Sequence, residues 1–213
     1  MKILLTGHRG FIGSHLLKAL EQKGHEVSTY EWGEILPSVL EQDWVIHVGA
    51  ISSTTEKDVE KIMQQNVDFT IQLYKACRTF GINFQFASSA SLYGLGFDFK
   101  EDAQVDPRTP YAWSKYLCER HINYHMGGNT TQIFRYFNVY GPREPLKGAY
   151  APVVGLFLRQ KKSNEPLTIV GDGTQRRDFA HVFDVVEANI LAMKTQTTGE
   201  IFNIGTGRNY SII

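Results

Sequence analysis

The segment TGHRGFIG, near the start of the chain, carries three glycines at a fixed spacing, Gly7, Gly10 and Gly13. An apolar run, KILLT at 2–6, comes before it, and an amphipathic stretch at 11–24 follows it. The spacing G-x-x-G-x-x-G differs from the standard G-x-G-x-x-G fingerprint. A tight turn, a close approach of phosphate to the backbone and a helix packed on a strand still each require a glycine. Because the helix N-terminus faces the phosphates, the segment predicts a dinucleotide site.

Strand patterns and helix patterns alternate over the rest of the chain. This alternation predicts an α/β fold, a doubly wound parallel sheet of the Rossmann-like type, with helices on both faces. Apolar runs and helical spacing predict strands at 2–6, 25–30, 43–50, 83–89, 130–138, 167–170 and 200–205, and helices at 11–24, 56–80, 111–125, 152–161 and 183–194.

Composition argues against several classes of protein. The 213 residues are 42% hydrophobic and 21% charged, and 22 basic and 22 acidic side chains cancel to a net charge of +0. This balance is typical of one globular domain over 1–213 and gives no electrostatic case for binding nucleic acid or a membrane. We find no signal peptide and no apolar run of the roughly 18 residues that a membrane span needs. Cys77 and Cys118 suggest free thiols in a cytoplasmic protein.

An acidic residue follows the glycines at the distance that a dinucleotide site requires. Glu31 ends the second predicted strand, 18 residues after Gly13, and fits the acid that binds the ribose hydroxyls of NAD. Arg9, inside the glycine loop, can instead accept the 2′-phosphate of NADP. The sequence leaves NAD and NADP both open.

A tyrosine and a lysine lie four residues apart in YAWSK at 111–115. On a helix, Tyr111 and Lys115 share one face, with Cβ atoms about 5–6 Å apart. An ammonium group at this distance stabilises the phenolate, so we expect Lys115 to lower the pKa of Tyr111. A phenol with a lowered pKa can exchange a proton with an alcohol.

Together with the glycines, this pair resembles the extended short-chain dehydrogenase/reductase superfamily, and SSASLYG at 88–94 is similar to its nucleotide-sugar epimerases. Within them, GAISSTTE at 49–56 and FRYFNVYGPRE at 134–144, with Lys147 following, are most similar to the ADP-glycero-manno-heptose 6-epimerases. RRDFAHVFDV at 176–185 and IFNIGTGR at 201–208 extend the resemblance over nearly the whole chain.

The resemblance implies a reaction on a nucleotide-diphosphate sugar. A sugar hydroxyl is oxidised to a ketone and reduced again on one tightly bound NAD or NADP. Tyr111 exchanges the proton, Ser89 hydrogen-bonds the oxyanion, Lys115 holds the nicotinamide ribose, and Lys147 is a second acid/base. The resemblance assigns cofactor binding to Gly7, Arg9, Gly10, Phe11, Ile12, Gly13, Glu31, Gly49, Ala50, Asn66, Tyr111 and Lys115, and substrate binding to Ser53, Thr54, Ser89, Asn138 and Arg177. It also implies a homodimer through helices 56–80 and 111–125.

The chain departs from the family in two places. Only 11 residues separate Glu31 from Asp43, where the family has a further strand, so we expect that edge strand to be missing or replaced by a short helix. The chain also ends soon after GTGRNYS, where the family continues, so we expect a small, truncated substrate lobe at 142–177. The chain is then a fragment, or a partner completes the site, or activity is lost.

Other functions share this scaffold. A UDP-hexose 4-epimerase and a nucleotide-sugar reductase stay open. The reductase is supported by GHRG at 7–10, which resembles GDP-fucose synthase, an NADPH reductase. A nucleotide-binding module without turnover is the alternative from another class. A 4,6-dehydratase is disfavoured because Ala90 and Ser91 stand where it needs acids. His121 and His125 lie four apart, as metal ligands can, but with no third ligand in view we expect no metal site.

Overall fold

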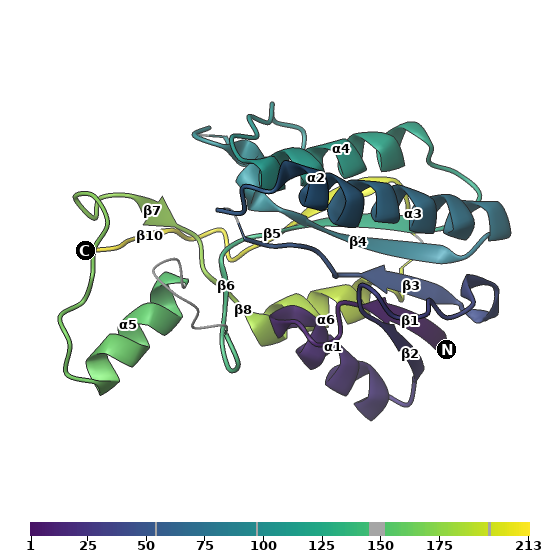
Figure 1. Cartoon of the computed structure of the whole chain (residues 1–213), viewed down its shortest axis with the longest axis horizontal. Helices are drawn as coiled ribbons and strands as arrows, with labels where there is room; N and C mark the ends of the chain where they lie inside the picture. The colour runs from purple at the N-terminus through teal and green to yellow at the C-terminus, as the bar shows by residue number, and fades with distance from the viewer. Residues whose placement is uncertain (54, 97, 145–151, 196) are drawn as a thin grey trace.

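The computed structural model describes residues 1–213 except 54, 97, 145–151 and 196. Its centre is one parallel sheet of six strands in the order β2-β1-β3-β4-β5-β9, with helices on both faces (Figure 1). This is the doubly wound, Rossmann-like fold that the alternation predicts. The strands are β1 (Lys2–Thr6), β2 (Glu26–Tyr30), β3 (Trp44–His47), β4 (Asn83–Ser89), β5 (Thr131–Tyr136) and β9 (Glu200–Ile204).

Two layers of helices cover the sheet. In β1, Ile3 and Leu5 face the core under α1 and α6, whereas Leu4 faces the core under α3 and α4. A strand buried on both faces reads as a continuous apolar run, which is why KILLT predicts it. The helices are α1 (Phe11–Gln22), α2 (Val59–Ile62), the π-helical η2 (Met63–Asp68), α3 (Phe69–Phe80), α4 (Pro110–Tyr124), α5 (Val153–Lys162) and α6 (Val182–Ala192), with the 3-10 helices η1 (Val39–Glu41) and η3 (Ala90–Tyr93).

The start of α4 is fixed by its own sequence. The Thr109 hydroxyl accepts a hydrogen bond of 3.1 Å from the Ala112 amide, and Pro110 occupies the first turn, where its missing N–H costs nothing. Cys118 of α4 and Cys77 of α3 are buried and free. No helix in the described part of the chain is long and apolar enough to cross a membrane.

The connection between β2 and β3 is as short as the sequence predicts. Residues 32–42, all of them described, form a turn after Glu31 and the short helix η1 but no strand, so β2 is the edge of the sheet. The expectation that the further strand is missing is therefore confirmed. Val39 of η1 packs in the same core cluster as Tyr30 of β2, so the short turn still buries apolar surface at this edge.

Two small sheets lie beyond the carboxyl ends of the main strands, to the left in Figure 1. In one, β6 (Val139–Tyr140) pairs with β8 (Ala180–His181); in the other, β7 (Arg176–Arg177) pairs with β10 (Tyr210–Ser211). Helix α5 lies near β7 and β10 (Figure 1). The interpretation of 142–177 as a partial substrate lobe stays a prediction.

The prediction of a strand at 167–170 is wrong. Residues 167–170 are irregular, and the Thr168 amide donates to the Gln160 side chain (3.1 Å) instead of to a neighbouring strand. The Gln160 amide donates in turn to the Thr168 hydroxyl (2.7 Å). An apolar run becomes a strand only where another strand lies beside it, and Val170 is 78% exposed.

A buried ion pair joins α4 to the middle of the sheet. Glu119 of α4 and Arg135 of β5 are 3% and 4% exposed, with 2.7 Å between the Arg135 Nη2 and Glu119 Oε2 atoms. A second bond of 3.1 Å links Arg135 Nε to Glu119 Oε1, so the pairing is bidentate. Arg135 Nη1 also donates to the Tyr93 hydroxyl, at 2.9 Å. The cost of burying two charges is thus offset by complete hydrogen bonding.

We predict that Arg135→Met destabilises the fold by about 3–5 kcal/mol, because it leaves the Glu119 carboxylate buried without its cation. Urea unfolding at pH 7 measures the change. Arg108→Met is the matched control, since Arg108 pairs with Asp106 at the surface and its loss should cost at most about 1 kcal/mol. Equal losses for the two variants would contradict the prediction.

Candidate active site

The glycine loop forms the turn between β1 and α1 that the spacing predicts. Gly7 has a φ of +76°, and a Cβ atom there would lie 2.5 Å from the backbone of Gly49, which follows β3. A Cβ atom at Gly13 would clash with the carbonyl oxygen of Gly7. Two of the three glycines are therefore required by the packing of the loop itself.

The first turn of α1 leaves amide groups available to a ligand. Gly10 is the N-cap and has no side chain to accept from them, and the first turn holds no acidic residue. The first intrahelical bond runs from the Ser14 amide to the Gly10 carbonyl, at 3.0 Å. The amides of Phe11, Ile12 and Gly13 thus have no intrahelical partner, and such groups favour a bound phosphate. These residues fit the pyrophosphate of a dinucleotide.

Glu31 lies directly beside this loop. Its Oε1 atom accepts the Arg9 amide at 2.6 Å, so the acid at the end of β2 is held against the glycines. The Arg9 guanidinium forms an ion pair with Glu34, and Glu34 accepts the Glu31 amide at 2.9 Å. Arg9 is therefore neutralised by a neighbouring acid, and two carboxylates surround the position where a ribose hydroxyl is expected.

Asn66 connects the loop after β3 to α4, which carries Tyr111 and Lys115. It lies in the π-helical turn η2, a geometry that is frequent at functional sites, and is 2% exposed. Its Oδ1 atom accepts the Ile51 amide (2.8 Å), and its Nδ2 atom donates to the Ile51 carbonyl (3.0 Å) and to the Ser114 hydroxyl (3.1 Å). The Ser114 hydroxyl donates to the Tyr111 carbonyl (2.7 Å), so Asn66 fixes the loop after Ala50 relative to Tyr111.

The structure brings Ser89, Tyr111 and Lys115 together at the end of β4. Ser89 is the N-cap of η3, and its hydroxyl oxygen accepts the Ser91 amide at 3.1 Å, which leaves the hydroxyl hydrogen free to donate. The Ser89 hydroxyl is close enough to Tyr111 to lower the pKa of its phenol. The Lys115 Nζ atom lies 5.9 Å from the centre of the Tyr111 ring and donates to the Ala87 carbonyl at 2.7 Å.

The expected electrostatic effect of Lys115 on Tyr111 is wrong for this arrangement. Burial raises the pKa of the Tyr111 phenol, and the Ser89 hydroxyl lowers it only in part. Burial also lowers the pKa of Lys115 to about 8, although Cys118 and Glu119 oppose this shift. Desolvation of both groups outweighs their spacing, because Lys115 is directed to a backbone carbonyl and not to the phenolic oxygen.

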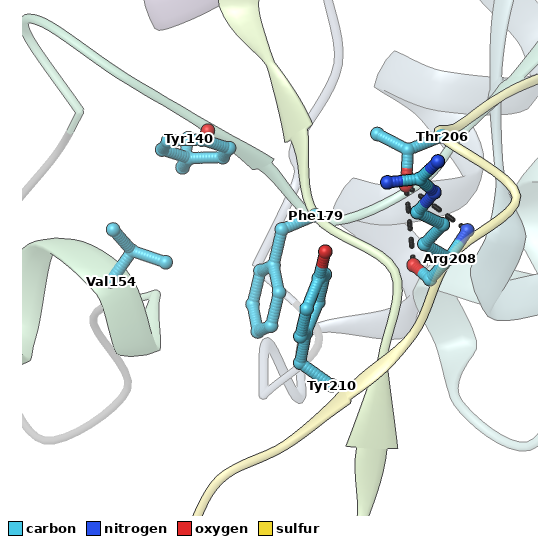
Figure 2. A pocket seen from close by; sticks show the side chains of 6 residues that line it. All are labelled: Tyr140, Val154, Phe179, Thr206, Arg208 and Tyr210. Atoms are coloured by element: carbon cyan, nitrogen blue, oxygen red, sulfur yellow. Dashed lines mark hydrogen bonds between the residues drawn. The ribbon is translucent and has the colours of Figure 1, made fainter.

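An open cleft of about 690 Å³ lies beside the two small sheets (Figure 2). Arg177, in β7, pairs through its backbone with Tyr210 of this cleft, and its guanidinium is exposed. Asn138 is held against the neighbouring backbone, because its Nδ2 atom donates to the Asp178 carbonyl at 2.8 Å. The cleft is lined by Tyr140, Val154, Phe179, Thr206, Arg208 and Tyr210.

One predicted substrate residue, Ser53, is described by the structure but makes no contact with Ser89, Tyr111 or Lys115 among its hydrogen bonds. Ser53 is exposed in the loop after β3, where its hydroxyl lies 3.0 Å from that of Thr55. Thr54 and Lys147 lie outside the described residues, so their roles stay predictions from the sequence.

Comparison with known proteins places the chain in a family. Residues 3–205 match the model of the NAD dependent epimerase/dehydratase family. The chain is 34% identical to an ADP-L-glycero-D-manno-heptose-6-epimerase of Thiobacillus denitrificans, over 96% of this chain and 73% of the relative. That alignment spans 242 positions, more than the 213 residues present, so the relative has segments that this chain lacks.

The chain belongs to the NAD dependent epimerase/dehydratase family. Among solved structures, it is similar to a UDP-N-acetylglucosamine 4-epimerase from Methanobrevibacter ruminantium, with a TM-score of 0.89, 28% identity, and coverage of 99% of this chain and 78% of that one. It is also similar to a UDP-glucuronic acid 4-epimerase from Bacillus cereus solved with UDP-glucuronic acid and NAD, with a TM-score of 0.86, 30% identity, and coverage of 100% and 80%.

One residue at this epimerase/dehydratase site was not predicted. His47, at the end of β3, is 1% exposed and lies between the hydroxyls of Thr6 (2.6 Å to Nδ1) and Thr70 (2.8 Å to Nε2). Thr70 donates to the Asn66 carbonyl and Thr6 accepts the Gly49 amide. A neutral imidazole with its proton on Nε2 satisfies every bond of this chain. His47 therefore links the end of β1 to Asn66, and a histidine within an apolar strand was its only signal.

We predict that His47 makes the fold sensitive to acid. Burial lowers its pKa to about 3. Below pH 6.5 His47 is protonated in the unfolded chain but neutral in the folded chain. The free energy of unfolding therefore falls as the pH drops toward 3, by at most about 1.4 kcal/mol per pH unit. His47→Gln should flatten this dependence in urea unfolding between pH 7 and 5. His25→Gln, at a partly exposed histidine, is the control and should keep most of the wild-type slope.

Proposed function

We propose that this chain is an NAD-dependent nucleotide-sugar epimerase that acts through a transient ketone. The observation that carries the proposal is the grouping of Ser89, Tyr111 and Lys115 at the carboxyl end of β4, on the same sheet edge as the glycine loop. NAD, when bound, supplies the acceptor and donor of hydride that this chemistry requires. A turnover assay with nucleotide sugars and no added cofactor tests the proposal, because an epimerase regenerates its cofactor in every cycle.

The chain's own groups handle the proton. The Tyr111 phenolic oxygen takes the proton from the sugar hydroxyl and returns it when the ketone is reduced. Ser89, whose hydroxyl hydrogen is free to donate, stabilises negative charge on the reacting oxygen. Lys115, positively charged below a pH of about 8, holds the cofactor ribose. Lys147 supplies the acid/base on the opposite face of the sugar.

The charges around the glycine loop favour NAD over NADP. Glu31 and Glu34 both lie next to Arg9, and the Arg9 guanidinium is already paired with Glu34. A 2′-phosphate would meet these carboxylates without a free cation, whereas a 2′-hydroxyl can donate to Glu31. An epimerase that keeps its cofactor through many cycles also needs it tightly bound.

The free, buried thiols of Cys77 and Cys118 support a cytoplasmic location.

The substrate is a nucleotide-diphosphate sugar held beside the cleft of Figure 2. Arg177 and Arg208 provide guanidinium groups suited to a diphosphate, and Asn138, whose side chain donates to the Asp178 carbonyl, is the proposed contact to the sugar. The heptose 6-epimerase relative supports an ADP-heptose. The structural similarity to UDP-sugar 4-epimerases supports a UDP-hexose as the second candidate. Comparing turnover of the two substrates decides between them.

The surface of α4 supports a homodimer. Trp113, Leu117 and Tyr124 are 49%, 37% and 84% exposed and recur at helical spacing along its outer side. An apolar stripe of this kind is typical of a surface buried by another chain. In the proposed dimer, α3 and α4 of two copies pair as a four-helix bundle.

We predict that Tyr111→Phe lowers turnover by about 10²–10⁴-fold, because only the group that exchanges the proton is lost. Binding of NAD should stay within a few-fold of wild type, as measured by calorimetry. Tyr116→Phe, on the same helix, removes an equivalent hydroxyl outside the catalytic group and should keep wild-type turnover. Wild-type turnover in Tyr111→Phe would refute the catalytic assignment.

We predict that Lys147→Ala stops inversion, while some ketone still forms through Tyr111. Mass spectrometry of the sugar product, with the ketone trapped, measures both. Lys162→Ala at the end of α5 is the control and should epimerise normally. Full inversion by Lys147→Ala would mean that Tyr111 serves both faces of the sugar. Stoichiometric consumption of NADPH by the wild type would instead identify a reductase.

A further inference from the structure

Trp32 lies beside the position where the adenine of a dinucleotide is expected. The acid at the end of the second strand binds the ribose of the adenosine half, and the base is bonded to that same ribose. Here the acid is Glu31, and Trp32 is the next residue. Because β2 is the edge of the sheet and 32–42 hold no strand, no further strand stands beside the base. Trp32 is the aromatic side chain that directly follows the acid.

The indole ring is held in place by its neighbours. It makes an edge-to-face contact with Phe69, at 5.7 Å between ring centres and 90° between planes. Phe69 in turn stacks on Tyr30 of β2, at 5.1 Å and 22°. The ring therefore rests on an aromatic group anchored in the sheet, although 46% of the Trp32 surface is exposed.

The backbone that carries Trp32 is also fixed. The Glu34 amide donates to the Glu31 carbonyl at 3.0 Å, and the Glu34 side chain accepts the Glu31 amide at 2.9 Å. Gly33 completes this turn with a φ of +92°, which other residues rarely adopt. An aromatic ring that is held before the ligand arrives loses little conformational entropy on binding.

We propose that Trp32 is the adenine platform of this chain, with one face of the indole stacked on the base in place of the missing edge strand. The proposal rests on the proposed function only in that the ligand is an adenine dinucleotide. It assigns the affinity for the adenosine half to Trp32 together with Glu31. Stacking of a base on an aromatic side chain is worth about ten-fold or more in affinity.

Tryptophan fluorescence tests the contact without any turnover. Trp44 is 4% exposed, so in a Trp113→Phe background Trp32 is the exposed indole of the chain. After removal of bound nucleotide, ADP-ribose and AMP should quench its emission, and nicotinamide mononucleotide should not. Equal quenching by nicotinamide mononucleotide, or no quenching by ADP-ribose at saturation, would overturn the proposal.

Calorimetry with variants separates this proposal from the proposed function. Trp32→Ala should weaken ADP-ribose about ten-fold or more, while Trp32→Phe, which keeps a ring against Phe69, should stay within a few-fold. Affinity for nicotinamide mononucleotide should be the same in all three proteins. If the wild type binds NAD but Trp32→Ala binds ADP-ribose equally well, the adenine platform is refuted alone. If the wild type binds no NAD, the proposed function fails first and the platform with it.

Discussion

The buried ion pair between Glu119 and Arg135 fixes α4, which carries Tyr111 and Lys115, to the sheet. Glu119 lies one helical turn after Lys115, and its carboxylate also accepts the hydroxyl of Ser88, the residue before Ser89. One carboxylate thus sets the position of α4, which carries two of the proposed catalytic residues, relative to β4, which carries the third. A helix held only by apolar packing can slide by small amounts, whereas a bidentate pair has one geometry.

Much of this arrangement follows from the sequence, but the pair does not. The glycines and the alternation predict the sheet and the loop, because each reflects local geometry. A charged residue such as Arg135 within the predicted strand indicates only that it has a partner. That partner is Glu119, which is 16 residues away on another element. The strand expected at 167–170 fails for a related reason, since pairing depends on what lies beside a segment.

The pKa of Tyr111 shows the same limit in the chemistry. A spacing of four residues correctly predicts that Tyr111 and Lys115 lie close together. It does not reveal that Lys115 is buried and Tyr111 partly buried, that Lys115 donates to the Ala87 carbonyl, or that desolvation therefore governs the pKa of both groups. Sequence spacing gives distances along one helix, whereas a pKa depends on solvent and on atoms from other elements.

The proposed cofactor site has two parts, one around Tyr111 and one around Glu31, and they are built in different ways. The part around Tyr111 depends on buried residues such as Asn66, His47 and Lys115, each of which is hydrogen-bonded to a neighbouring segment of the chain. The part proposed for adenosine is an exposed turn at the sheet edge that carries Glu31 and Trp32. Where the further edge strand is missing, η1 buries Val39 instead, and none of the proposed catalytic residues that the structure describes belongs to this core cluster. Changes at this edge can therefore alter cofactor affinity while leaving the proton chemistry intact.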